Sequence, residues 1–133
     1  MSDKFENLGK AAEKLGLGHY HRHVFLCLGP DCCQPEVGEA AWDVLKKELK
    51  DRNLSLHRGP NECYRTKVNC LRVCSAGPIM VVYPEGTWYH GMAADRIPRF
   101  VQEHLVEGRP VQEWVFARNP LPNPEDGTGE RGA

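Results

Sequence analysis

The sequence predicts an α/β fold, with a small mixed sheet of four strands, two core helices and a helical extension at the N-terminus. Runs of strand-forming residues alternate with amphipathic helical stretches, and Gly- and Pro-containing turns separate them. The chain has 133 residues, 41% of them hydrophobic, which is enough for one modest core. We therefore expect one folded domain at residues 21–117, a helical extension at 1–20 and a disordered tail at 118–133.

The first half of the chain contains two helical patterns around one strand. Apolar residues at helical spacing between positions 4 and 16 predict a short amphipathic helix. Residues 21–28 are rich in strand formers and end at Gly29-Pro30, a turn signal. Apolar residues line one face again from 38 to 52, which predicts the clearest helix of the chain.

The second half supplies three strands and a closing helix. Side chains alternate over residues 63–68, and residues 77–92 form a pattern of two strands joined by a tight turn at 84–86. An apolar stripe from Ile97 to Leu105 predicts a helix that ends at Gly108. The order strand, helix, strand, strand, strand, helix fits a thioredoxin-like arrangement, in which helices pack on a small mixed sheet.

Charge and apolar run length exclude several classes of function. The 17 basic and 18 acidic residues nearly balance, which disfavours binding to nucleic acid or to an anionic membrane. The start, MSDKFENLGK, carries charges where a secretory signal needs a hydrophobic stretch. We expect a cytoplasmic protein, and in a reducing compartment close-spaced cysteines bind metal or do redox chemistry more often than they form structural disulfides.

Four of the six cysteines form two close pairs, Cys27-x4-Cys32 and Cys70-x3-Cys74. Each pair lies where a predicted strand gives way to a loop. Because parallel strands joined by a crossover helix end at the same edge of a sheet, the two pairs can converge in space. Four thiolates suit either a [2Fe-2S] cluster or tetrahedral zinc.

The spacing within the pairs favours iron and sulfide over zinc. Structural zinc sites made of four cysteines usually use C-x2-C knuckles, and both spacings here are wider. From residue types alone, a four-cysteine zinc module and a thiol-disulfide protein remain alternatives. No nucleotide-binding glycine motif, GxSxG, HExxH or C-x-x-C at a helix start is present, so we do not expect an enzyme.

The segments "HVFLCLGPDCC", "NCLRVCSAGPIMVVYPEGTWYHGM" and "EHLVEGRPV" resemble the thioredoxin-like [2Fe-2S] ferredoxin family. The two cysteine spacings are also similar to those of the small [2Fe-2S] subunit of respiratory complex I. The resemblance covers residues 21–112. It implies one [2Fe-2S] cluster on Cys27, Cys32, Cys70 and Cys74, one-electron exchange with redox partner proteins, and a homodimer.

The adjacent Cys33 makes the second ligand ambiguous. Spacing from Cys27 selects Cys32, whereas family members commonly place a glycine four residues after that ligand, and Gly38 lies six after Cys32 and five after Cys33. We expect Cys32 to be the ligand. The isomer of the Gly77-Pro78 bond is left open.

The other cysteine and the histidines are not expected to bind metal. Cys63 lies within strand-like alternation and is expected to be a buried, inert thiol. His19, His21 and His23 alternate, but the Cys-x-His motifs of a Rieske site are absent. We expect these histidines to lie on a solvated strand face or in the loop before it.

Overall fold

The computed structural model describes residues 2–55, 62–73 and 75–121. Cys74 and residues 122–133, most of the expected tail, lie outside this part of the chain. Within it, every helix is too short or too polar to span a bilayer. The elements are α1 (Ser2–Leu15), β1 (Arg22–Cys27), α2 (Pro35–Asp51), β2 (Cys63–Val68), β3 (Met80–Tyr83), β4 (Thr87–Tyr89), η1 (Ala94–Arg96), α3 (Ile97–Phe100), η2 (Val101–Val106), η3 (Gln112–Trp114) and β5 (Val115–Arg118).

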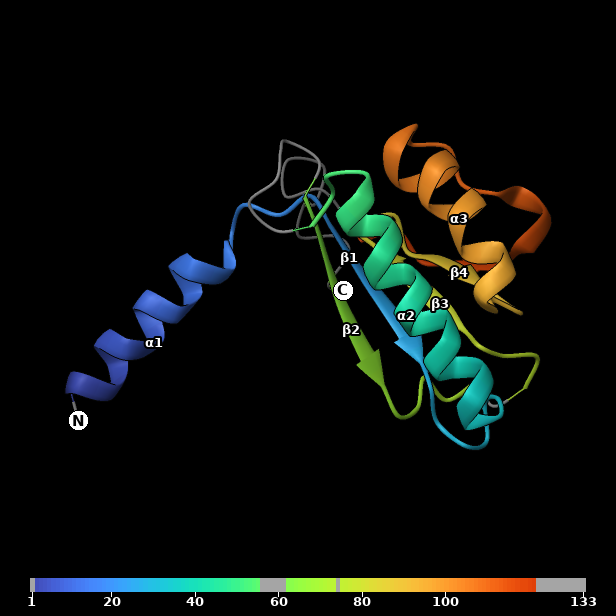
Figure 1. Cartoon of the computed structure of the whole chain (residues 1–133), viewed down its shortest axis with the longest axis horizontal. Coiled ribbons are helices and arrows are strands. Elements are labelled where there is room, and N and C mark those ends of the chain that lie inside the picture. The colour runs from blue at the N-terminus through green and yellow to red at the C-terminus, as the bar shows by residue number, and fades with distance from the viewer. Residues whose placement is uncertain (1, 56–61, 74, 122–133) are drawn as a thin grey trace, which may run out of the picture.

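The strands form one mixed sheet in the order β2-β1-β3-β4-β5 (Figure 1). Strands β1 and β2 are parallel and are joined through α2, whereas every other pair is antiparallel. The predicted mixed α/β sheet with helices on it is therefore confirmed. The crossover through α2 is what allows β1 and β2 to run in the same direction.

The sheet has five strands, so the prediction of four was wrong. Strand β5 pairs antiparallel with β4 and ends at Arg118, one residue beyond the expected domain boundary. Its four residues are largely exposed and have no clear alternation, because a short edge strand packs only one side against the sheet. The chain stays attached after β5, where the Asn119 N–H donates to the Gly86 carbonyl over 2.7 Å.

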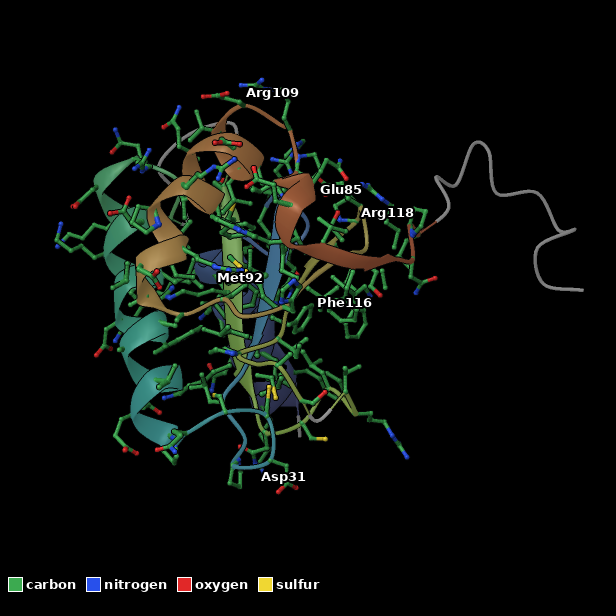
Figure 2. The ribbon with its side chains drawn as sticks, turned by 90° about the vertical axis from the view of Figure 1, so that its right-hand side faces the viewer. Asp31, Glu85, Met92, Arg109, Phe116 and Arg118 are labelled. Atoms are coloured by element: carbon green, nitrogen blue, oxygen red, sulfur yellow. The ribbon has the colours of Figure 1, made fainter. Side chains whose placement is uncertain are left out.

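The core lies between the sheet and one helical layer made of α2, α3 and η2 (Figures 1 and 2). Side chains alternate between the two faces of each strand, so every second residue of β1 and β3 points to this layer. Buried strand residues in this core include Val24, Leu26, Cys63, Met80, Val82 and Tyr89, and they pack with Leu45, Leu49, Phe100, Val101 and Leu105 of the helices.

Helix α1 is the predicted amphipathic N-terminal helix, and it extends away from the sheet (Figure 1). Phe5 and Leu8 on its apolar stripe are 72% and 65% exposed. Gly16, with φ of +74°, follows the last helical residue, and the Leu17 N–H bonds back to the Ala12 carbonyl. The Gly16 N–H also bonds to the Glu13 carbonyl, and the two bonds satisfy carbonyl groups at the end of α1.

A buried polar chain secures the end of the sheet where β1 begins. The Val111 N–H donates to the Tyr89 hydroxyl, which in turn donates to Nδ1 of His104 over 2.7 Å. His104 is fully buried, and its Nε2–H donates to the Glu85 carboxylate over 3.0 Å. Arg22 donates its Nε–H to the same carboxylate oxygen over 2.6 Å.

Glu85 is the ionised end of this polar chain. Burial opposes its ionisation, but hydrogen bonds from His104 and Arg22 outweigh burial and lower its pKa from 4.5 to about 2. Since the folded carboxyl has the lower pKa, its contribution to stability is fully present above pH 4.5 and is lost as the pH falls toward 2.

We predict that Glu85→Gln lowers the free energy of unfolding at pH 7 by about 2 kcal/mol, because a neutral amide is a weaker partner for Arg22 and His104. The difference from the wild type should shrink as the pH falls from 4.5 toward 2. Denaturant unfolding followed by circular dichroism measures both effects. Glu13→Gln, on the exposed surface of α1, is the control, and an equal loss in the two variants would contradict the prediction.

Candidate metal centre

The two predicted cysteine loops begin at the same end of the sheet, where β1 and β2 finish. Cys27 is the last residue of β1 and pairs in register with Val68, the last residue of β2. The Cys27 thiol lies 3.8 Å from the carbonyl oxygen of Asn69, to which it can donate its proton. Asn69 directly precedes Cys70, so the loop after β2 lies against the first cysteine of the other loop.

The loop after β1 folds back so that Cys32 lies near the end of the strand. Its N–H donates to the Gly29 carbonyl over 3.0 Å, which closes the loop, and its sulfur accepts the Ile79 N–H over 3.3 Å. Cys27 and Cys32 are 1% and 7% exposed, and they form a small apolar cluster with Ile79, against which Val68, Leu71 and Trp88 pack.

Cys70 lies on the exposed side of the site. Its sulfur accepts the N–H of Arg72 over 3.2 Å. Arg72 has φ of +69°, in the left-handed region that favours glycine. Cys74, the fourth predicted ligand, lies outside the described residues.

Within the described part of the chain, no three Cys, His, Asp or Glu side chains gather closely enough to hold a single metal ion. Cys27 and Cys32 come together, and Cys70 follows on the adjoining loop. His23 lies elsewhere, with its Nε2 2.7 Å from the Thr66 hydroxyl and its ring stacked on Phe25. The histidine is thus accounted for by contacts with the sheet.

Cys63 and Cys33 are placed differently from the predicted ligands. Cys63 is the first residue of β2, at the opposite end of the sheet, and burial raises the pKa of its thiol to about 12. Cys33 is half-buried beside the start of α2, with its sulfur 4.0 Å from the Cys27 carbonyl oxygen. A Cβ added at Gly38 would lie 3.2 Å from that sulfur.

A comparison with models of known protein families finds no match. The chain is 31% identical to a 2Fe-2S ferredoxin from Clostridium pasteurianum in an alignment of 97 residues that covers 68% of this chain and 90% of that relative. The chain belongs to the [2Fe-2S] ferredoxins. The present chain is also 28% identical over 109 residues to a 2Fe-2S ferredoxin from Aquifex aeolicus, and the alignment covers 76% of this chain and 94% of that protein.

The solved structures agree on the fold. A thioredoxin-like [2Fe-2S] ferredoxin from Aquifex aeolicus superimposes with a TM-score of 0.64 at 24% identity, covering 78% of this chain and 97% of that one. The predicted thioredoxin-like fold is thus confirmed. The ferredoxin is an electron carrier with a [2Fe-2S] cluster, and this membership decides between the cluster and the zinc or thiol-disulfide alternatives.

Two glycines let the loops of the ferredoxin approach each other closely. A Cβ on Gly77 would lie 2.3 Å from the carbonyl oxygen and 2.4 Å from the sulfur of Cys32. A Cβ on Gly29 would lie 1.7 Å from the Asn69 carbonyl oxygen. The packing around Cys32 therefore requires glycine at position 77. The Gly77-Pro78 peptide bond, whose isomer the sequence left open, is cis.

The chemistry of these loops fits an iron–sulfur cluster. The Ile79 and Arg72 N–H groups each point at a cysteine sulfur, and such hydrogen bonds stabilise negative charge on sulfur ligands. Burial, together with the nearby Cys27, raises the pKa of the Cys32 thiol to about 12, although the Ile79 N–H opposes the shift. Because ligands bind as thiolates, cluster binding must displace this proton.

Sequence reasoning located the cysteines but not the groups that support them. Ile79 looked like an ordinary strand residue, and nothing in its neighbours showed that its N–H faces Cys32. Arg72 carried no signal either, because residue type does not indicate a left-handed conformation where glycine is absent. The Ala76-Gly77-Pro78 run was the one local hint of a close approach.

We predict that Gly77→Ala lowers the iron content of the ferredoxin by more than half and reduces its melting temperature. The new methyl group would collide with the backbone of Cys32, so the loop that positions its sulfur must move. Iron analysis and thermal unfolding measure the two effects. Gly9→Ala is the matched control, since a Cβ there meets nothing within 4 Å. Full iron content and unchanged melting in Gly77→Ala would contradict the prediction.

Proposed function

We propose that Cys27, Cys32, Cys70 and Cys74 are the four ligands through which this ferredoxin holds its [2Fe-2S] cluster. The observation that carries the proposal is the burial of Cys27 and Cys32 in one cluster, with Asn69 of the second loop against the Cys27 thiol. Once bound, the cluster supplies one-electron transfer. The chain holds the sulfurs, excludes water from two of them and directs N–H groups at Cys32 and Cys70.

Burial supports Cys32 rather than Cys33 as the second ligand. The Cys32 sulfur lies in the apolar cluster with Cys27 and Ile79 and already accepts an N–H bond, as a cluster-bound thiolate does. The Cys33 sulfur instead lies toward Gly38 at the start of α2. Cys33 is then a spare thiol next to the centre.

We expect the wild-type ferredoxin to contain about two iron and two sulfide ions per chain, to be red-brown and to give an EPR signal on reduction. Cys32→Ser should lose most of this iron and sulfide, because serine cannot supply a thiolate. Cys33→Ser should keep both. Chemical analysis of iron and acid-labile sulfide after anaerobic purification is the measurement.

Cys63→Ser is the matched control, since this buried cysteine lies at the other end of the sheet. Loss of the cluster in Cys33→Ser but not in Cys32→Ser would transfer the second ligand to Cys33. A colourless wild-type protein with stoichiometric zinc would replace the whole proposal with the four-cysteine zinc module.

We also propose that the ferredoxin is a homodimer and that the sheet face opposite α2 and α3 forms the contact. This face carries half-buried rings: His23 stacks on Phe25 with centroids 4.0 Å apart, Tyr64 lies 4.9 Å from His23, and Tyr20 lies 5.2 Å from Tyr64. Helices α2 and α3 lie on the other face of the sheet (Figures 1 and 2). Aromatic rings are enriched at protein interfaces.

We predict that Tyr64→Glu converts the dimer into a monomer in sedimentation experiments, because a charge in the contact would lose its water without gaining a partner. Lys10→Glu, on the exposed surface of α1, should remain a dimer. A wild-type protein that is monomeric, or a Tyr64→Glu variant that is a folded dimer, would overturn the dimer proposal and leave the cluster proposal untouched.

The finer functional setting is also a proposal. We infer that the ferredoxin exchanges electrons with redox partner proteins in the cytoplasm and has no catalytic activity of its own, nor a nucleic-acid or membrane partner. The near-balance of 17 basic and 18 acidic residues supports the last point. The five described cysteines form no disulfide with one another, which fits a reducing compartment.

A further inference from the structure

An apolar hollow lies beside the proposed cluster ligands. Its volume is about 230 Å³, and it is lined by Val73, Ser75, Ala76, Ile79, His90 and Phe116. Three of these residues belong to the segment that carries Cys70 and Cys74, and Phe116 comes from the edge strand β5. The hollow therefore spans the gap between the cysteine loops and the edge of the sheet.

Ile79 connects this hollow to the cysteines. It is 1% exposed, packs with Cys27 and Cys32, and donates its N–H to the Cys32 sulfur. A side chain that enters the hollow and touches Ile79 is therefore separated from a proposed ligand by one residue. Electron transfer between two proteins requires such proximity. A second recess, near Cys27, is polar rather than apolar, because Glu39 and Lys67 line it.

The rim of the hollow exposes apolar side chains to solvent. Val73 is 37% and Phe116 is 43% exposed, and the Phe116 ring packs edge-on against Trp88 with centroids 6.3 Å apart. Figure 2 shows Phe116 on the side of the sheet away from α2. An exposed aromatic ring that is braced from behind provides contact area at little cost in conformational entropy.

Arg72 adds a positive charge next to this rim. Arg72 is exposed and directly precedes Val73. It is the only Lys, Arg, Asp or Glu in the sequence from 69 to 79. Its left-handed backbone is unfavourable for arginine and would not be for glycine. Glycine at this position would present the same N–H to Cys70, so what arginine adds is its charge.

We propose that the hollow and Arg72 form the docking surface for a redox partner protein that presents an apolar side chain beside an acidic one. The apolar side chain fits against Val73, Ile79 and Phe116, and the acid pairs with Arg72. The inference rests on the proposed cluster function and specifies the partner's chemistry. Charge complementarity at the rim guides encounter, and the apolar contact brings the partner close to Cys32.

The test uses the reduced, full-length ferredoxin with cytochrome c as electron acceptor, in its native basic form and with its lysines succinylated. Both forms carry the same haem, so surface charge is the main difference between them. At low ionic strength, Arg72→Glu should slow reduction of the succinylated form about tenfold and speed that of the native form. Stopped-flow absorbance at the haem band measures both rates.

Arg109→Glu is the matched charge control, because this exposed arginine lies at the end of the molecule opposite to Asp31, which is in the loop between Cys27 and Cys32 (Figure 2). Phe116→Ser, outside both cysteine loops, tests the apolar contact and should slow both acceptors about threefold or more. Val106→Ser, at a position that is 40% exposed on η2, is its control.

Rates in Arg72→Glu and Phe116→Ser that differ from the wild type no more than those of their controls would overturn the docking surface. A Phe116→Ser variant that becomes monomeric would overturn it too, by assigning the hollow to the contact between two copies. Iron and sulfide analysis separates these results from failure of the proposed function, since a wild-type protein without a cluster would refute that function itself.

Discussion

The parallel pairing of β1 and β2 is the constraint on which the metal centre depends. The crossover through α2 makes the two strands run in the same direction, so that Cys27 and Val68 end at one edge of the sheet. Asn69 then lies against the Cys27 thiol, and the loop with Cys70 follows. An antiparallel pair would separate the two loops by the length of a strand.

The two ends of this sheet carry different chemistry. Toward the end where β1 begins, Tyr89, His104 and Glu85 form a hydrogen-bonded chain that ends on one oxygen of the Glu85 carboxylate, while its other oxygen is buried without a hydrogen-bond partner among the described residues. At the other end, Cys27 and Cys32 are buried mainly among apolar side chains. This polar chain is thus kept apart from the sulfurs of Cys27 and Cys32, where added negative charge would oppose thiolate formation.

Cysteine spacing predicted the general position of the site but not its detailed arrangement. The pairs 27/32 and 70/74 follow predicted strands, and the parallel pairing places the start of the second loop at Cys27. Spacing alone could not separate Cys32 from Cys33, because adjacent residues in a loop point in directions that depend on its closure. The bond from the Cys32 N–H to the Gly29 carbonyl sets that closure and turns the Cys32 sulfur toward Ile79.

The amino-acid pattern by itself determined the helices, four strands and the thioredoxin-like order, because their apolar periodicities reflect burial on one face. Only the tertiary structure decided that Val115–Arg118 adds a fifth strand, since a short exposed strand depends on the free edge of β4 and has little periodicity of its own. It also decided the left-handed Arg72 and the hollow between Val73 and Phe116. These features depend on how the chain packs in three dimensions, so local residue preferences do not predict them.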